Sequence, residues 1–110
     1  MTTQLFAQQR DDGTVDAGVV KKRAIQCALS RICGSCGKSL TWPVAFVGSA
    51  EEAAALLFAF PPLHPSCAEE LLRDAPGEQV LVRTGGFELV RPTRRGDPVS
   101  FRPNSVIEDD

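Results

Sequence analysis

The fold of this chain is decided by two short stretches, Cys33-Gly34-Ser35-Cys36-Gly37 and Leu63-His64-Pro65-Ser66-Cys67. The first spells Cys-x2-Cys and the second spells His-x2-Cys, and the second holds the only histidine of the chain. Zinc prefers four sulfur and nitrogen donors at tetrahedral positions, and two close pairs separated by a longer stretch are a common way to supply them. The spacing therefore predicts a zinc site whose ligands are Cys33, Cys36, His64 and Cys67.

Other interpretations of the same residues are open. Cysteine packs well in protein cores, so the four side chains can also be unrelated buried residues. Iron–sulfur clusters usually take four thiolates, and a thioredoxin-like redox pair would leave His64 and Cys67 without a role. Zinc deaminases place His-x-Glu before the cysteine pair, which is the reverse of the order here. We favour one structural Zn²⁺ and no enzymatic activity, because four protein ligands leave no open position for a reacting water.

Size and composition are those of an ordinary globular domain. The chain has 110 residues, 43% of them hydrophobic and 24% charged, which fits one domain spanning residues 1–110. The longest apolar run, Ala53 to Phe60, is far shorter than the roughly 20 residues that a membrane-spanning helix needs. Because the N-terminus also lacks a secretory pattern, we expect a cytoplasmic protein without a membrane partner, in which thiols stay reduced.

Capping residues and apolar spacing predict three helices. Asp16 is the expected N-cap of a helix that runs to about Ile32. Ser49 is followed three residues later by Glu52, which spells a capping box for a second helix that Pro61-Pro62 would end. A third helix is expected from His64-Pro65 to about Asp74, since proline is favoured at the first helical position.

Strands are expected on both sides of the helical region. Gln4–Gln9 can form a short strand, and Leu40–Val47 can form a β-hairpin after the first cysteine pair. Two further strands, Gln79–Arg83 and Phe87–Arg91, flank Thr84-Gly85-Gly86 as a predicted turn. Pro98–Arg102 can add another strand. The architecture we predict is therefore α+β: an N-terminal helix with a treble-clef-type zinc finger (16–76), a β-meander (78–103) and a loose tail (104–110).

Charge is distributed unevenly along the chain. Residues 17–41 carry five bases and no acid, namely Lys21, Lys22, Arg23, Arg31 and Lys38. Residues 42–78 carry six acids and one base. The function we favour is a non-enzymatic protein-interaction adaptor or regulator. Its interaction face would be either the acidic side (Glu51, Glu52, Glu69 and Glu70) or the arginine-rich hairpin (Arg83, Arg91, Arg94, Arg95 and Arg102). The alternatives are a nucleic-acid-binding regulator that uses the basic block from Lys21 to Lys38, and an accessory protein that holds an anionic small molecule. No feature of the sequence indicates an oligomeric state.

The cysteine and histidine stretches carry two resemblances. Together with Ala45-Phe46-Val47-Gly48 and Pro61-Pro62, they resemble small uncharacterised zinc-finger-like proteins of actinobacteria and their phages over about Ile32 to Leu72. That resemblance implies the same four ligands and no established activity. The Cys-x2-Cys and His-x2-Cys spacing is also similar to the nick-sensing finger of poly(ADP-ribose) polymerases. That family grips DNA phosphates with bases between the two ligand pairs, where this chain has Lys38 alone.

Overall fold

The computed structural model describes residues 5–10, 12, 14, 18–74, 77–94 and 96–107. These residues form a short 3-10 helix, three α-helices and three strands, which confirms the α+β class. In chain order the elements are η1 (Phe6–Gln8), α1 (Lys21–Ser30), β1 (Val44–Gly48), α2 (Ala50–Ala55), α3 (Pro65–Asp74), β2 (Val80–Val90) and β3 (Ser100–Ile107). The strands make one antiparallel sheet in the order β1-β2-β3. In the described part of the chain, no helix combines the length and apolar character needed to cross a membrane.

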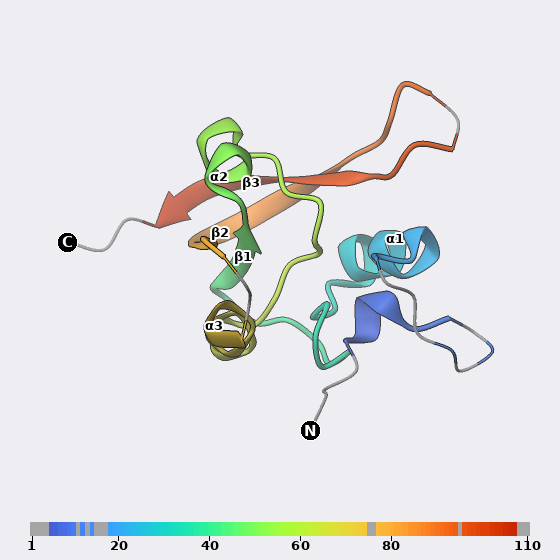
Figure 1. Ribbon diagram of the computed structural model, residues 1–110, viewed down its shortest axis with the longest axis horizontal. Coiled ribbons are helices and arrows are strands. Elements are labelled where there is room, and N and C mark those ends of the chain that lie inside the picture. Colours follow the sequence, from blue (N-terminus) through green and yellow to red (C-terminus); the bar gives the residue numbers. More distant parts are fainter. Residues whose placement is uncertain are drawn as a thin grey trace.

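Helices lie around both ends of the sheet, with α2 and α3 near the end at which β3 finishes (Figure 1). Figure 1 shows β2 and β3 as a long ribbon, with α3 beside β1 at one end and with α1 and η1 together at the other. All five residues of β1 are buried, because alternate side chains enter two different clusters. Val44 and Phe46 belong to the larger cluster, where Phe46 stacks on Phe58 with ring centroids 5.3 Å apart. Ala45 and Val47 belong to the second cluster, which also contains Cys33 and Ala68. β1 therefore joins the cysteine-bearing lobe to the aromatic core.

The expected first helix is shorter in the structure. α1 begins at Lys21 with Val20 as its N-cap, and the predicted cap Asp16 lies outside the described residues. The helix ends two residues before the predicted Ile32, because Arg31 adopts a left-handed conformation with φ 52°. This conformation commonly ends helices, and here it turns the chain directly into Cys33.

The second and third helices follow their capping signals. The Ser49 side chain accepts a hydrogen bond from the Glu52 amide, and the Glu52 side chain accepts one from the Ser49 amide, which confirms the capping box. α2 stops at Ala55 rather than at Pro61-Pro62. The helix cannot continue through Phe58, because the Phe58 backbone exchanges two hydrogen bonds with Phe101 of β3. α3 spans Pro65–Asp74, which confirms the third prediction.

Thr84-Gly85-Gly86 is not a turn, so the predicted hairpin across it is wrong. β2 runs through these residues without a break and pairs with β3 on both sides of them. An added Cβ would lie 3.0 Å from Trp42 Nε1 at Gly85 and 2.6 Å from Asn104 Oδ1 at Gly86. The two glycines therefore make room for side chains from other segments, which is an established role of glycine inside strands.

The remaining strand predictions also need correction. The predicted strand at Gln4–Gln9 is instead η1, as far as the chain is described there. Leu40–Val47 is not a hairpin: β1 starts at Val44 and pairs with β2 and, through Ala45, with Leu63. β3 extends to Ile107 because β2 offers partners beyond Arg102, so the predicted loose tail is wrong up to that residue. Residues 108–110 lie outside the described part.

Candidate metal centre

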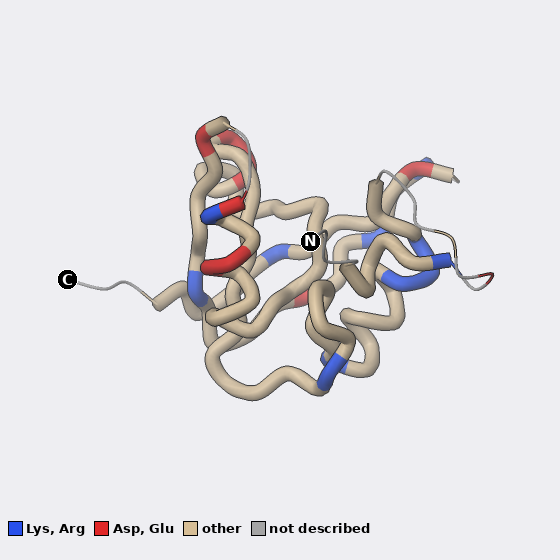
Figure 2. Tube along the Cα trace, turned by 60° about the horizontal axis from the view of Figure 1, so that its bottom comes forward, with Lys and Arg blue, Asp and Glu red and all other residues tan. Residues whose placement is uncertain are grey.

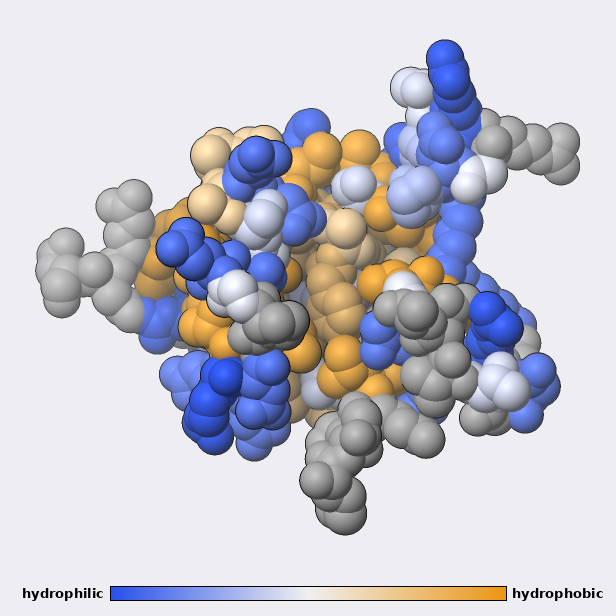
Figure 3. Space-filling model, viewed as in Figure 1, coloured by the Kyte–Doolittle hydropathy of each residue, from blue (hydrophilic) through white to orange (hydrophobic). Residues whose placement is uncertain are grey.

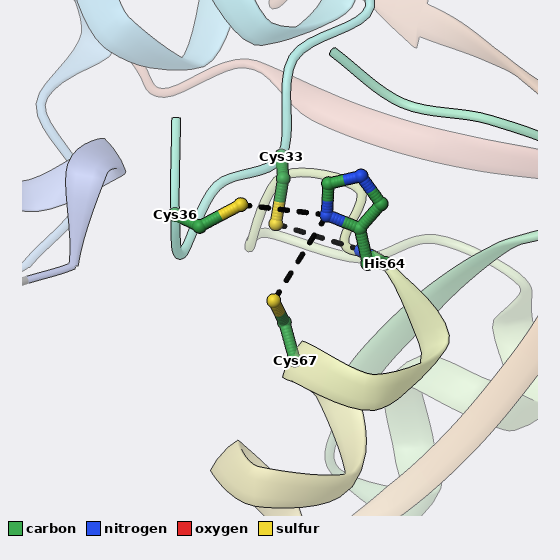
Figure 4. A group of neighbouring side chains, drawn as sticks. All are labelled: Cys33, Cys36, His64 and Cys67. Carbon is green, nitrogen blue, oxygen red and sulfur yellow. Dashed lines mark hydrogen bonds between the residues drawn. The ribbon is translucent and has the colours of Figure 1, made fainter. Parts of the chain in front are cut away.

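The structure brings the four predicted ligands together. Their ligand atoms, three Sγ and one imidazole nitrogen, all lie within 4.8 Å of one another. Cys33 and Cys36 sit on the turn that follows α1, which we call the knuckle (residues 33–37). His64 directly precedes α3, and Cys67 lies in the first turn of that helix. Figure 4 shows the four side chains pointing toward a common centre. Two segments distant in sequence thus form a group that can hold a metal ion.

The histidine is oriented by a backbone carbonyl. His64 Nε2 lies 2.8 Å from the carbonyl oxygen of Ser39. A carbonyl oxygen only accepts hydrogen bonds, so Nε2 carries the proton and Nδ1 keeps its free lone pair. Nδ1 faces the sulfurs, at 3.4 Å from Cys36 Sγ and 3.9 Å from Cys67 Sγ. The imidazole is therefore held in the tautomer that a metal ligand requires.

Backbone amides surround the buried sulfur of Cys33. The amide of Ser35 donates to this sulfur over 3.4 Å, and the amide of His64 donates over 3.5 Å. Such hydrogen bonds stabilise a thiolate and orient it as a ligand. The turn that allows them closes when the Gly37 amide donates to the Cys33 carbonyl over 3.0 Å, with Gly37 at φ +76°. Cys33 is fully buried and Cys36 is exposed, so the centre faces solvent on one side only.

Neighbouring segments hold the knuckle in place. The Gly34 amide donates to the Pro62 carbonyl over 2.9 Å, which ties the knuckle to the segment leading to His64. The amides of Phe6 and Ala7 donate to the carbonyls of Ser35 and Gly34. An added Cβ at Gly34 would lie 3.0 Å from the Phe60 ring, so glycine permits this close packing. The ligands are thus positioned by three stretches of backbone.

Burial and the clustering of the sulfurs act on the pKa of Cys67. Burial and then the neighbouring sulfurs of Cys33 and Cys36 raise the pKa of Cys67 to about 12. The dipole of α3 would favour a thiolate at this position, but burial and the neighbouring sulfurs outweigh that effect on the pKa. A divalent ion would reverse the balance, because it attracts all three sulfurs and displaces their protons.

The donor set and two of the donor–donor distances are compatible with zinc, while the whole group spans up to 4.8 Å. Zinc at ~2.3 Å from sulfur and ~2.1 Å from nitrogen places neighbouring tetrahedral donors roughly 3.5–3.8 Å apart. The distances from His64 Nδ1 to the sulfurs of Cys36 and Cys67, 3.4 Å and 3.9 Å, lie close to these values. A donor set of three sulfurs and one nitrogen also suits zinc better than magnesium or calcium, which prefer oxygen ligands.

Cys27, the fourth cysteine, lies apart from the cluster. It is fully buried on α1. Burial, and secondarily the nearby Cys33, raises the pKa of its thiol to about 12.

Sequence reasoning missed the backbone groups of the site, the carbonyls of Ser39 and Pro62, because backbone partners leave no signature in residue type. The glycines of the knuckle were the only sequence signal that the backbone turns tightly around the ligands.

Charged side chains are segregated in space as they are in sequence. Figure 2 shows a group of Lys and Arg at and beside α1 and a group of Asp and Glu at α2 and α3, where Arg73 also lies. In Figure 3, hydrophilic residues cover α3 and the loop between β2 and β3, with hydrophobic residues between them. The metal-ligand cluster remains the strongest functional feature of the described residues.

No protein-family model matches the chain, and no match is found among curated proteins or solved structures.

Proposed function

We propose that this chain is a small non-enzymatic zinc-finger protein in which one Zn²⁺, bound by Cys33, Cys36, His64 and Cys67, organises the fold for a protein-interaction role. The observation that carries this proposal is the convergence of the four ligand atoms within 4.8 Å, from the knuckle and from the start of α3. Below roughly 70–80 residues a core rarely suffices alone, and a chain of 110 residues still gains substantially from a metal that joins distant segments.

The arrangement supports a structural ion rather than a catalytic one. Four protein donors complete the tetrahedral coordination of zinc, so no position is left for a water or a substrate. The second nitrogen of His64 is engaged by Ser39, and the chain has no other histidine that could act as a general base. The proposed role of the metal is therefore to add folding free energy.

The order of elements supports a treble-clef type of finger in part, since the single strand β1 stands where a hairpin was expected after the knuckle. A knuckle with two ligands, a strand, and a helix that starts with the second ligand pair follow one another along the chain, with α2 inserted before α3. The resemblance to the small actinobacterial and phage zinc-finger proteins implies the same four ligands, and membership of that group is part of the proposal. A reducing, cytoplasmic setting would keep the three thiols available to zinc.

The charge of the surface supports the adaptor role better than it supports nucleic-acid binding. The basic block on α1 is partly engaged within the molecule: the Arg23 guanidinium donates to the carbonyl of Gln9 and to the side chain of Gln26, and it also lies 4.9 Å from the Phe6 ring centroid. The acids of α2 and α3 and the net charge of −2 would repel a polyanion. Protein partners tolerate such mixed charge.

Elemental analysis of the purified protein tests the zinc proposal. We expect one zinc per chain, lost together with the folded circular-dichroism signal when a chelator is added and regained with zinc. Cys67→Ser should lose the metal and the fold, whereas Cys27→Ala, which removes a buried sulfur outside the cluster, should keep one zinc per chain. A compact protein without stoichiometric metal would contradict the proposal.

A further inference from the structure

The single tryptophan of the chain lies largely in solvent. Trp42 is 72% exposed, although tryptophan is mostly buried on average in folded proteins. Its indole Nε1 lies over Gly85 of β2, where an added Cβ would come within 3.0 Å of it. Glycine at this position therefore leaves room for the indole against the strand. Exposed tryptophans of this kind are enriched among the residues that dominate protein–protein binding.

A stacked arginine lies in the same region. The Arg31 guanidinium carbon lies 5.2 Å from the ring centroid of Phe87, two residues along β2 from Gly85. The backbone also brings the two segments together, because the Leu40 amide donates to the Arg31 carbonyl over 2.8 Å, two residues before Trp42. Arg31 and Trp42 thus both lie beside one short stretch of β2, Trp42 at Gly85 and Arg31 at Phe87.

Among the residues that the structure describes, Arg31 has no acidic partner, and its guanidinium stacks on the Phe87 ring. A guanidinium that stacks on an aromatic ring keeps its N–H edge free, and this edge matches a carboxylate with two parallel hydrogen bonds. Lys38 adds positive charge in the same basic segment, where residues 17–41 carry no acid. The charge of this region is therefore complementary to an acidic group on a partner.

We propose that Trp42 and Arg31 form a docking surface, here the Trp42–Arg31 surface, for a protein segment that places a carboxylate beside an aliphatic or proline side chain. The carboxylate binds the edge of the Arg31 guanidinium, and the apolar side chain packs on the exposed indole face. This inference rests on the proposed adaptor function and names the part of the molecule that performs it. Nucleic acid fits less well, because one exposed aromatic ring offers a single stacking platform and the chain is net acidic.

Tryptophan fluorescence gives a direct readout, since the chain has one tryptophan and no tyrosine. The zinc-loaded protein is used to select from a phage-displayed library of random dodecapeptides, and the enriched peptides are synthesised and titrated. We expect enriched sequences with Asp or Glu next to Leu, Ile, Val or Pro. We also expect a blue shift of the emission and protection of Trp42 from acrylamide quenching.

Matched variants then test the two residues with a labelled peptide. Trp42→Ala and Arg31→Ala should each weaken binding roughly tenfold or more, while Leu29→Ala, which removes another exposed apolar side chain, should leave it unchanged. One zinc per chain in every variant shows that the fold is intact. Failure to enrich acidic peptides, or equal binding by all three variants, would overturn the surface. So would an emission shift produced by oligothymidylate or oligouridylate but by no peptide. These results would not by themselves contradict the adaptor function. That function would still hold if the variants keep one zinc per chain and bind a protein partner as well as the wild type does.

Discussion

The Nε2 atom of His64 lies 2.8 Å from the carbonyl oxygen of Ser39, a residue three positions after Cys36. This hydrogen bond joins the knuckle segment to the start of α3 independently of any metal. It also fixes which nitrogen of the imidazole is left for coordination. The position of the metal ligands is thus prepared by the backbone, and the consequences can be measured on the histidine itself.

We predict that the zinc-loaded protein holds His64 as the Nε2–H tautomer, with Nδ1 on the metal. The Ser39 carbonyl accepts a hydrogen bond from Nε2, so the lone pair that faces the sulfurs is that of Nδ1. Long-range ¹⁵N–¹H correlation spectra of the ring distinguish the two tautomers. The Nε2 proton should also exchange slowly with solvent. A spectrum with the proton on Nδ1 would contradict this orientation.

A second prediction concerns the loss of one ligand. His64→Ala should unfold the chain, because structural zinc typically supplies ~10–16 kcal/mol while whole domains are stable by only ~5–15 kcal/mol. His64→Cys should keep zinc and most of the helical signal, since four thiolates also satisfy a structural site. Thermal melts followed by circular dichroism, together with zinc content, separate the two variants. Equal melting temperatures for His64→Ala and the wild type would show that the metal does not organise the fold.

The sequence predicted the features that rest on local signals. Pro65 at the first position of α3 and the Ser49–Glu52 capping box depend on residues within one turn, so both were recognisable. The ligand set was recognisable because its spacing is local within each pair. Thr84-Gly85-Gly86 misled because glycines usually mark turns, whereas here they accommodate Trp42 and Asn104 from distant positions. The early end of α2 was hidden for the same reason, since its cause is the pairing of Phe58 with Phe101.

A third prediction uses another glycine that a side chain presses on. An added Cβ at Gly48 would lie 2.7 Å from Cδ1 of the fully buried Phe58 and 2.6 Å from Glu52 Oε1. Because the Phe58 ring is packed against Phe46, it cannot move without cost. Gly48→Ala should therefore lower the free energy of unfolding by about 1–3 kcal/mol. For a domain of this size, each kcal/mol lowers the melting temperature by roughly 4–8 °C or slightly less, which a thermal melt followed by circular dichroism measures.

Gly18→Ala is the matched control for Gly48→Ala. Apart from its chain neighbours, no atom of the described residues lies within 4 Å of an added Cβ at Gly18, and its backbone is not in the left-handed region. The same chemical change should therefore leave the melting temperature unchanged or raise it slightly, because alanine restricts the unfolded chain. Similar losses of stability in both variants would show that the contact with Phe58 is not the cause.

The last prediction concerns alkaline pH and Cys27. Burial raises the pKa of this thiol from 9.0 to about 12 in the folded protein. Below pH 9 the thiol is protonated in both the folded and the unfolded state, so it does not affect stability. Above that pH the unfolded chain loses the proton and the folded chain keeps it, which lowers the free energy of unfolding by about 1.4 kcal/mol per pH unit until the folded pKa is reached.

Denaturant melts of the wild type and of Cys27→Ala between pH 8 and pH 11 isolate this effect. The variant lacks the thiol but keeps every lysine and every metal ligand, so the difference between the two free energies of unfolding removes all other titrations. That difference should be constant below pH 9 and should move in favour of the variant above it. Parallel curves for the two proteins over the whole range would mean that Cys27 ionises as easily in the folded protein as in the unfolded chain, and that the core around α1 is open to water.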